Sequence, residues 1–468
     1  MMAQFMGNAA LACLLIPLLL IAGKGIRRVV RVFDALYLPT AIIAGVLGLL
    51  LGPQVIGRFF PETSFLHHGV FPQAVFKIWS QMPKLLISVV FAGLFIGKPM
   101  PGLRAVWRMG GPQAMLGYTI SLGQYAVGLA ATILLLAPVF GINPLAGVLL
   151  EISLSGGHGT AAGLAPTFAE LGFAEGQDLA LGLATVGLVT GVVLGTAFVN
   201  YAVRSDRITI AREEPPEGDE GFELSALQDN ENPQHKPAPS TTADPFSLHL
   251  GLVAVAIAIG YVLLKSLQFI EHHTWGAITG DLMGYVPLFP MAMIGGALLQ
   301  AFLGATGFQP WVNRDLINRI SGTALDFIIV SAMATLSLTS IGRNWQPFAI
   351  LAVVGMAWTV FCFWALAPRM IPDRWFEKGI GDFGQGTGMA VSGLLLMRIA
   401  DPENKSRALE SFGYKQLPFE PFLGGGLVTA LALPLCAQFG PLVMLALTGA
   451  GAVACAITGM LLFGKNRS

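Results

Sequence analysis

The residues best suited to chemistry lie in two short glycine-rich stretches, each inside an apolar segment. The first stretch, Ser155-Gly156-Gly157-His158-Gly159-Thr160, interrupts the apolar segment 143–172. The second stretch, Gly384-Gln385-Gly386-Thr387, lies in the apolar segment 372–400. Glycine adopts left-handed backbone conformations readily and leaves backbone N–H and C=O groups uncovered. Both stretches can therefore present polar backbone atoms to a ligand.

Backbone groups of this kind, placed next to hydroxyl groups, are suited to bind ions. A half-helix that is expected to begin at Thr160 directs its partially positive amino end at the interruption, where it favours a carboxylate. The helix before the stretch offers carbonyl oxygens, and with side-chain hydroxyls these suit a hard cation such as Na+. The hydroxyls of Ser155, Thr160 and Thr387 are therefore the candidate Na+ ligands.

The elements that must hold these stretches are membrane helices. Hydrophobic residues make up 54% of the 468 residues and charged residues only 12%, about half of the usual charged share. So few charges cannot cover a soluble protein of this length, and the composition predicts an all-α polytopic membrane protein. The net charge is zero, which argues against the basic surface that binding to nucleic acid requires.

Apolar stretches of about 20 residues predict about eleven transmembrane helices. They cover residues 7–22, 37–52, 78–97, 112–140, 177–204, 247–267, 285–304, 320–341, 347–370, 419–438 and 441–463. In segments 143–172 and 372–400, each side of the glycine-rich stretch is too short to cross, so each segment is expected to be a re-entrant hairpin. Most lysines and arginines fall in loops that this assignment places in the cytoplasm. The N-terminus is therefore expected outside and the C-terminus in the cytoplasm.

The two halves of the chain are expected to form inverted repeats of five helices. Five crossings precede residues 205–246 and five follow them, so segments 1–204 and 247–438 must insert in opposite orientations. Three short patterns recur in both halves in the same order: Tyr37-Leu38-Pro39 with Tyr285-Val286-Pro287, Gly157-His158-Gly159-Thr160 with Gly384-Gln385-Gly386-Thr387, and Leu188-Val189-Thr190 with Leu427-Val428-Thr429. Inverted repeats with paired broken helices are typical of secondary transporters.

Two segments lie outside the repeats. Residues 205–246 are rich in glutamate, aspartate and proline, a composition that cannot bury a core. They are expected to be a disordered acidic linker in the cytoplasm. Residues 439–468 carry one further apolar stretch, which is expected to be an additional C-terminal transmembrane helix.

Ionisable residues at membrane depth are candidates for function because burying them is costly. Glu151 lies one helical turn before Ser155; it either binds a cation or proton or remains a carboxylate at the outer interface. Asp382 either holds a cation or pairs with Lys378, four residues earlier. Asp326 lies within a predicted helix and is a candidate cation ligand. His158 either contacts the substrate or has a structural role.

Both glycine-rich stretches resemble the pore-loop motifs of the glutamate:sodium symporter family. Residues 153–162 are similar to the first motif and residues 382–387 to the second, and Asn143-Pro144-Leu145 and Gln124 also fit. The resemblance covers about residues 35–438 of the chain. It implies a Na+-coupled symporter of the bacterial inner membrane, a homodimer without an organic cofactor, in which a core built around the hairpins slides against a scaffold.

The resemblance also implies a substrate and its site. Glutamate or a related carboxylate or amino acid would bind where the two glycine-rich stretches and Gln124 meet, with Na+ as the coupling ion. Transport of another organic anion with Na+ or H+ is the alternative. An ion channel also uses glycine-rich loops, but these usually come from identical subunits around one axis. The sequence has no metal or nucleophile motif of a hydrolase, so an enzyme is not expected.

Overall fold

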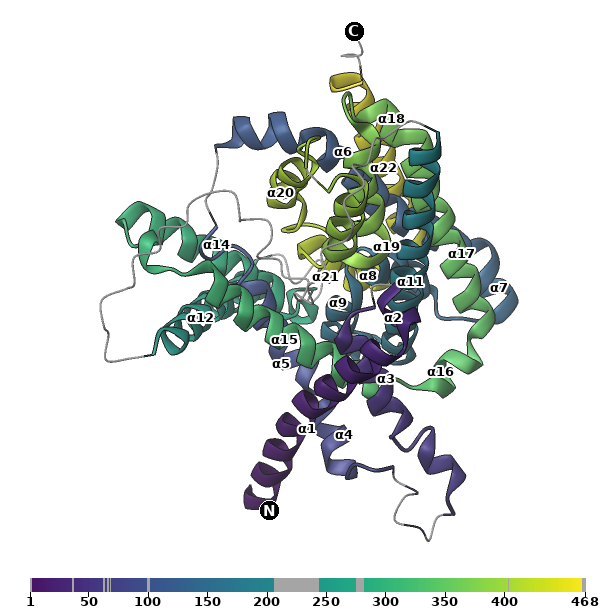
Figure 1. Ribbon diagram of the computed structural model, residues 1–468, viewed down its shortest axis with the longest axis vertical. Coiled ribbons are helices and arrows are strands. Elements are labelled where there is room, and N and C mark those ends of the chain that lie inside the picture. The colour runs from purple at the N-terminus through teal and green to yellow at the C-terminus, as the bar shows by residue number, and fades with distance from the viewer. Residues whose placement is uncertain are drawn as a thin grey trace.

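A computed structural model of the chain is built from helices (Figure 1). It describes residues 2–35, 38–61, 64, 67, 69–98, 102–205, 244–274, 282–402 and 404–464. Residues 206–243 of the predicted linker lie outside the described part. Within the described part, nine helices are long and apolar enough to cross a membrane. Helix α1 begins at the bottom of Figure 1 and α22 ends at its top.

The helices of the first half end in a long helix at residue 204. They are α1 (Met2–Val29), α2 (Arg31–Ala35), α3 (Thr40–Leu50), η1 (Ile56–Phe59), α4 (Gln73–Trp79), α5 (Met82–Ala92), α6 (Leu103–Ala131), a π-turn η3 (Thr132–Leu136), α7 (Ala137–Phe140), η4 (Pro144–Val148), α8 (Leu149–Leu154), α9 (Gly157–Gly163), α10 (Ala165–Glu170) and α11 (Glu175–Arg204). The Asn143 side chain begins η4 by accepting the Leu145 N–H at 2.9 Å, which is the usual action of an N-cap asparagine.

The second half is also built from long helices with short interruptions. Its elements are α12 (Pro245–His273), η6 (Leu282–Tyr285), α14 (Leu288–Thr306), η7 (Gln309–Trp311), α15 (Arg314–Ala334), α16 (Leu338–Arg343), α17 (Trp345–Phe361), a π-turn η8 (Cys362–Leu366), α18 (Ala367–Met370), α19 (Trp375–Ala400), α20 (Ala408–Phe419), α21 (Leu427–Phe439) and α22 (Pro441–Leu462).

Helices α6 and α17 share an unusual ending. Each runs into a π-turn, and each π-turn is followed by a four-residue helix that begins with Ala-Pro, at Ala137-Pro138 and at Ala367-Pro368. π-Turns are rare and often lie near functional sites. In both halves the interrupted segment follows directly, so the same irregularity precedes each break.

The helices pack in two groups. One group contains α1, α3, α5, α12, α14 and α15, in which each helix packs against at least one other of the group. The other contains α6, α8, α9, α11, α17, α19, α20 and α22. In Figure 1, α12 and α14 stand at the left, and α6, α17 and α22 stand at the right. Helix α9 is one place where the groups touch, because it packs against α5 and α15 as well as α11.

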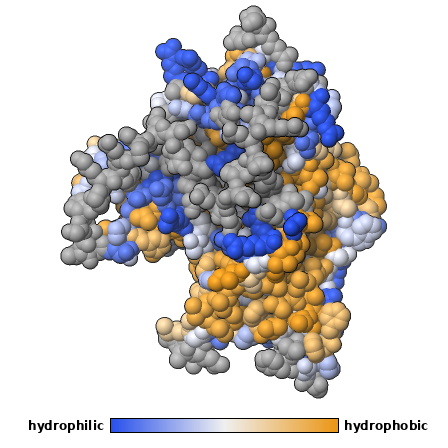
Figure 2. Space-filling model, in the orientation of Figure 1, coloured by the Kyte–Doolittle hydropathy of each residue, from blue (hydrophilic) through white to orange (hydrophobic). Residues whose placement is uncertain are grey.

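Apolar side chains cover much of the outer surface. Figure 2 shows them over the lower and right-hand parts of one face, with hydrophilic residues toward the top. Large exposed apolar residues occur on most long helices, among them Leu14, Leu134, Phe302, Val353 and Leu447. A soluble monomer rarely exposes so large an apolar area, so the surface is that of a protein surrounded by lipid.

Several predicted helix limits are wrong. Segment 78–97 is instead α4 and α5, which together span Gln73–Ala92. The helix predicted at 112–140 already begins at Leu103, and the one predicted at 320–341 ends at Ala334. Segment 419–438 is not one helix, because residues 420–426 separate α20 from α21. Segment 37–52 holds only the 11-residue α3, so two of the eleven predicted crossings are short helices in the structure.

Candidate functional site

The first glycine-rich stretch interrupts its helix, as predicted. Helix α8 ends at Leu154 and α9 begins at Gly157, which corrects the expectation that the second half-helix starts at Thr160. Gly157 has a φ of +75°, a left-handed conformation that a side chain makes costly. All residues from Ser155 to Thr160 are buried. The break therefore lies inside the protein and not on its surface.

The second break lies at the end of its glycine-rich stretch. Gly388 and Met389 have non-helical backbone angles, whereas residues 384–387 are helical, so the predicted position is corrected by a few residues. The chain folds back at this point. Cβ atoms built on Gly384 and Gly381 would meet Gly393 and Met397, which follow the break. Residues 375–387 and 390–400 are therefore the two arms of a hairpin.

The two breaks touch each other. A Cβ atom on Gly157 would overlap the Sδ and Cγ atoms of Met389, so the tip of one break rests on the tip of the other. Met389 itself has a φ of +71°, which is rare for a residue with a side chain and costs about 1–3 kcal/mol. Such strain is concentrated at functional sites, and here it lies where two distant segments meet.

Gln124 of α6 links the two breaks with its side-chain amide. Its Nε2 donates to the Gly386 carbonyl at 2.6 Å and to Thr359 Oγ1 at 3.1 Å. Its Oε1 accepts the Ser155 hydroxyl at 2.8 Å. Ser121 Oγ, one turn earlier on α6, donates to Ser155 Oγ at 3.1 Å. These five polar groups thus form one buried network across both breaks.

The other two candidate Na+ ligands also lie at the breaks. Thr160 Oγ1 donates to the Gly156 carbonyl at 2.9 Å. Thr387 Oγ1 donates to the carbonyls of Phe383 and Gly384, at 3.0 and 3.1 Å. A hydroxyl has one hydrogen and two lone pairs. Because the hydrogens are used within each helix, the oxygen lone pairs remain to accept a cation.

Glu151 is completely buried, with none of its surface exposed. The alternative of a carboxylate at the outer interface is therefore wrong. Its Oε1 accepts the Gly424 N–H at 2.8 Å and the Thr429 hydroxyl at 3.0 Å, and its Oε2 accepts the Tyr125 hydroxyl. All of these donors are neutral. The site therefore stabilises a carboxylate by dipoles, and a bound cation or proton would complete its charge balance.

A third break completes the site, and the sequence analysis missed it. Residues 420–426 connect α20 to α21 and contain three consecutive glycines, Gly424-Gly425-Gly426. Besides the Gly424 contact to Glu151, a Cβ atom on Gly425 would lie 2.6 Å from Thr160 Oγ1. Three consecutive glycines indicate an interrupted helix, but the apolar residues on both sides led to the prediction of one continuous helix.

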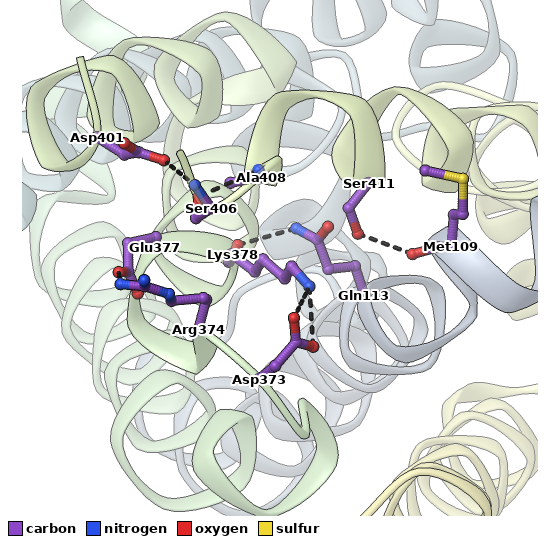
Figure 3. A network of polar contacts seen from close by, with 10 residues as sticks. All are labelled: Met109, Gln113, Asp373, Arg374, Glu377, Lys378, Asp401, Ser406, Ala408 and Ser411. Carbon is purple, nitrogen blue, oxygen red and sulfur yellow. Dashed lines mark hydrogen bonds and ion pairs between the residues drawn. The ribbon is translucent and has the colours of Figure 1, made fainter. Parts of the chain in front are cut away.

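Asp382 does not pair with Lys378. Lys378 Nζ instead contacts both carboxylate oxygens of Asp373, at 3.0 and 2.9 Å, within the polar network drawn in Figure 3. The partner of Asp382 is Lys415 of α20, with Nζ 2.5 Å from Oδ1 and both side chains buried. The alternative of an ion pair holds for Asp382, but with a different lysine.

Two predicted site residues do not link the two breaks. Asp326 is exposed on α15 and makes no hydrogen bond to residues of either break. His158 is buried, and its Nε2 lies 2.9 Å from Thr185 Oγ1 of α11. This contact fits the structural alternative for the histidine. The residues that join the breaks are instead Gln124, Ser155, Gly157 and Gly386.

Comparison with known proteins identifies the family. The profile of the sodium/glutamate symporter family matches residues 84–372, more than half of the chain. The chain belongs to the sodium/glutamate symporter family. Two relatives named sodium/glutamate symporter, from Escherichia coli (strain K12) and Shigella flexneri, are 24% identical over 366 residues, 75% of this chain and 80% of each relative. A third of that name, from Haemophilus influenzae, is 26% identical over 218 residues, 46% of this chain and 48% of the relative.

Membership confirms the family that the sequence motifs indicated. A sodium/glutamate symporter is a transporter and not an enzyme, and the family name implies Na+ as the coupling ion and a small anionic substrate. The matched residues 84–372 include the first break but end before the second. The second break, with Asp382 and its surroundings, therefore lies beyond the residues that the family profile matches.

Proposed function

We propose that this protein takes up glutamate or a related carboxylate or amino acid together with Na+ across the bacterial inner membrane. The observation that supports this best is the meeting of two buried helix breaks, joined by the Gln124 side chain. At this point backbone groups, hydroxyls and a buried carboxylate converge without a permanent cation at Glu151. A site of this composition is suited to an organic anion and a hard cation together.

Within this proposal, the site residues divide between the two ligands. Na+ is bound through the oxygens of Ser155, Thr160 and Thr387, with Glu151 supplying negative charge. The substrate carboxylate lies between the two breaks, and Gln124 positions both of them. On one side it faces the amino end of α9, at Gly156, Gly157, His158 and Gly159. On the other side it faces the second break, at Gly384, Gln385 and Gly386. Asp326 and Asp382, the other two cation-ligand candidates, are not assigned to Na+ in this scheme, because Asp326 lies exposed on α15 and Asp382 is paired with Lys415.

The domain organisation is proposed as two inverted repeats, residues 1–204 and 247–438. The shared π-turn and Ala-Pro ending of α6 and α17, directly before each break, supports the repeat. The segments 143–172 and 372–400 are the re-entrant hairpins, and residues 439–468, which hold α22 against α6, are an addition. The N-terminus lies outside, the C-terminus in the cytoplasm, and two copies form a homodimer.

Alternating access is proposed to occur by sliding of one helix group against the other. The contact between α9 and α5 is apolar and nearly smooth. Gly163 and Gly159 of α9 face Ile87 of α5, and a Cβ on Gly163 would lie 3.3 Å from the Ile87 Cβ. Small residues let helices approach closely without interlocking side chains. This surface is therefore suited to movement between the two groups.

A cross-link across this surface is expected to stop transport. The predicted Cβ separation of Ile87 and Gly163 is close to the range of a disulfide. Ile87→Cys with Gly163→Cys, after replacement of Cys13, Cys362, Cys436 and Cys455 by alanine, should lose uptake at least about tenfold on oxidation, because gating motions limit turnover. Reduction should restore uptake. Oxidation of the Ile87→Cys variant alone is the control, and full uptake by the cross-linked protein would contradict the sliding movement.

Uptake of labelled glutamate into proteoliposomes tests the proposed function directly. An inward Na+ gradient should raise the initial rate at least about tenfold over choline, because coupling energies between two ligands are typically 1–3 kcal/mol. A rate indifferent to Na+ would refute Na+ coupling. The neutral surroundings of Glu151 also support the second candidate, another organic anion coupled to H+. Uptake driven by a pH gradient, with competition by a panel of carboxylates, distinguishes the two.

A further inference from the structure

The buried ammonium group of Lys415 has the surroundings of a bound cation. Only 1% of the residue is exposed. Its Nζ lies 2.5 Å from Asp382 Oδ1 and 2.5 Å from Gln385 Oε1. The aromatic rings of Phe412 and Phe419 lie on other sides, with centroids 4.9 and 4.4 Å from Nζ. Carboxylate, amide oxygen and aromatic faces are all groups that attract a monovalent cation.

The ligands around this ammonium are themselves held in place. Asp382 Oδ2 accepts the Gln113 amide at 3.2 Å. The side chains of Gln385 and Gln416 exchange two hydrogen bonds of 3.1 Å. Burying a charge is costly unless it is paired and its ligands are hydrogen-bonded, and both conditions are met. The surroundings of Lys415 therefore form a built site, whose oxygens are held by hydrogen bonds to neighbouring side chains.

This site lies beside the second break and has no equivalent at the first. The matching patterns of residues 157–160 and 384–387 place Asp382 where the first half has Ser155. Ser155 is neutral and bonded to Gln124 and Ser121, and the carboxylate near it, Glu151, has only neutral donors. The first half therefore leaves a negative charge for a mobile ion, whereas the second half supplies its own positive charge.

We propose that Lys415 is a tethered cation, and that Asp382, Gln385, Phe412 and Phe419 form a site for a monovalent cation that the lysine side chain fills. The second break then carries its own cation, the Lys415 ammonium group, and needs no ion from solution. This proposal goes beyond the uptake of Na+ and substrate, because it implies that the mobile ion binds at the first break. It rests on the proposed function only for that last step.

The structure shows how the site could be emptied. Lys415 passes close to Gly117 of α6, where a Cβ atom would lie 2.6 Å from Cε and 2.9 Å from Nζ of the lysine. The absent side chain at Gly117 therefore makes room for the lysine stem. Lys415→Ala removes that stem and its charge, leaving a channel-shaped space that ends at the Asp382 carboxylate. n-Propylammonium has the three carbons and the ammonium group that the substitution removes.

The test measures whether a free cation fills the emptied site. Lys415→Ala is expected to lose Na+-driven uptake at least about 100-fold, as truncating one partner of a buried charge pair does. n-Propylammonium should restore at least about a tenth of the wild-type rate. In purified full-length protein it should also raise the melting midpoint of Lys415→Ala by about 3 °C at saturation, because binding to the folded state stabilises it. Choline at equal ionic strength, too large for the space, should have no effect.

Two controls make every result decisive. Wild type and the double variant Asp382→Asn/Lys415→Met, which fills the space without charge, should show no melting response to n-propylammonium. An unchanged melting midpoint of Lys415→Ala would overturn the proposal. So would failure of Lys415→Ala to fold at any amine concentration while the double variant folds, because the space would then admit no free cation. The melting response needs no transport, so it can succeed even where Na+-driven glutamate uptake fails.

Discussion

Replacing Gly157 with alanine should lower Na+-driven uptake about 100-fold while the protein remains folded. The new Cβ atom would overlap Met389 at the tip of the second break, and Gly157 has a φ of +75°. Overpacking and the left-handed backbone together cost about 3 kcal/mol, which corresponds to about two factors of ten. The cost falls on the contact between the two breaks. Initial uptake rates in proteoliposomes, with the melting midpoint of the purified protein, measure both parts of this expectation.

Gly172→Ala is the matched control for this substitution. Gly172 has nearly the same backbone angle, with a φ of +72°, but a Cβ atom on it would meet nothing within 4 Å. It therefore carries the same backbone strain without the clash. Uptake by Gly172→Ala should stay within about threefold of wild type, because αL strain alone costs about 1 kcal/mol on an exposed loop. Equal losses in the two variants would show that the contact with Met389 is unimportant.

Glu151→Gln should abolish the response to Na+ without unfolding the protein. The glutamine Oε1 can still accept the Gly424 N–H and the Thr429 hydroxyl, and its amide can donate to the Tyr125 oxygen. Shape and hydrogen bonds are thus retained, and only the negative charge is lost. We expect the Na+-driven rate to fall about 100-fold, as removing one partner of a buried ion contact costs about 3 kcal/mol.

A Na+ titration of uptake checks this expectation. The stimulation by Na+ that wild type shows should be nearly absent in Glu151→Gln, whereas its melting midpoint should match wild type. Glu170→Gln on α10 is the control, because Glu170 is exposed and its charge already lies in water. A wild-type Na+ response in Glu151→Gln would place the coupling ion elsewhere, with the hydroxyls of Ser155, Thr160 and Thr387 as the remaining ligands.

Most of the helical architecture could be predicted from hydropathy. Nine long apolar helices are found within the predicted crossings or overlap them, since a span of apolar residues is a local property of the chain. The predicted ends of the helices were less accurate where a glycine-rich break interrupts an apolar segment. The break at residues 420–426 interrupts an apolar segment. Its contacts with Glu151 and Thr160, which only the tertiary structure shows, place it at the candidate site.

The candidate site was predicted in part. The first break and Glu151 lie together as their residue types indicated, because glycines and buried polar groups stand out against an apolar background. Gln124 was implied by the resemblance to the family. Lys415, Tyr125 and Thr429 were missed. Lys415 lies in a helix with ordinary polar neighbours, and Tyr125 and Thr429 are common residues of membrane helices. Nothing in their local sequence shows that they face a buried carboxylate.

Hydropathy and the paired glycine-rich stretches predict a membrane transporter with two broken helices, and the resemblance of the motifs adds the symporter family. They also predict that charge at membrane depth is scarce and therefore meaningful. Packing decides which charges meet. Asp382 binds Lys415, 33 residues away, and not its neighbour on the same helix, and Glu151 meets Thr429 across 278 residues. The reason is physical: helix formation and membrane insertion depend on contiguous residues, whereas the balance of a buried charge depends on whichever helices pack around it.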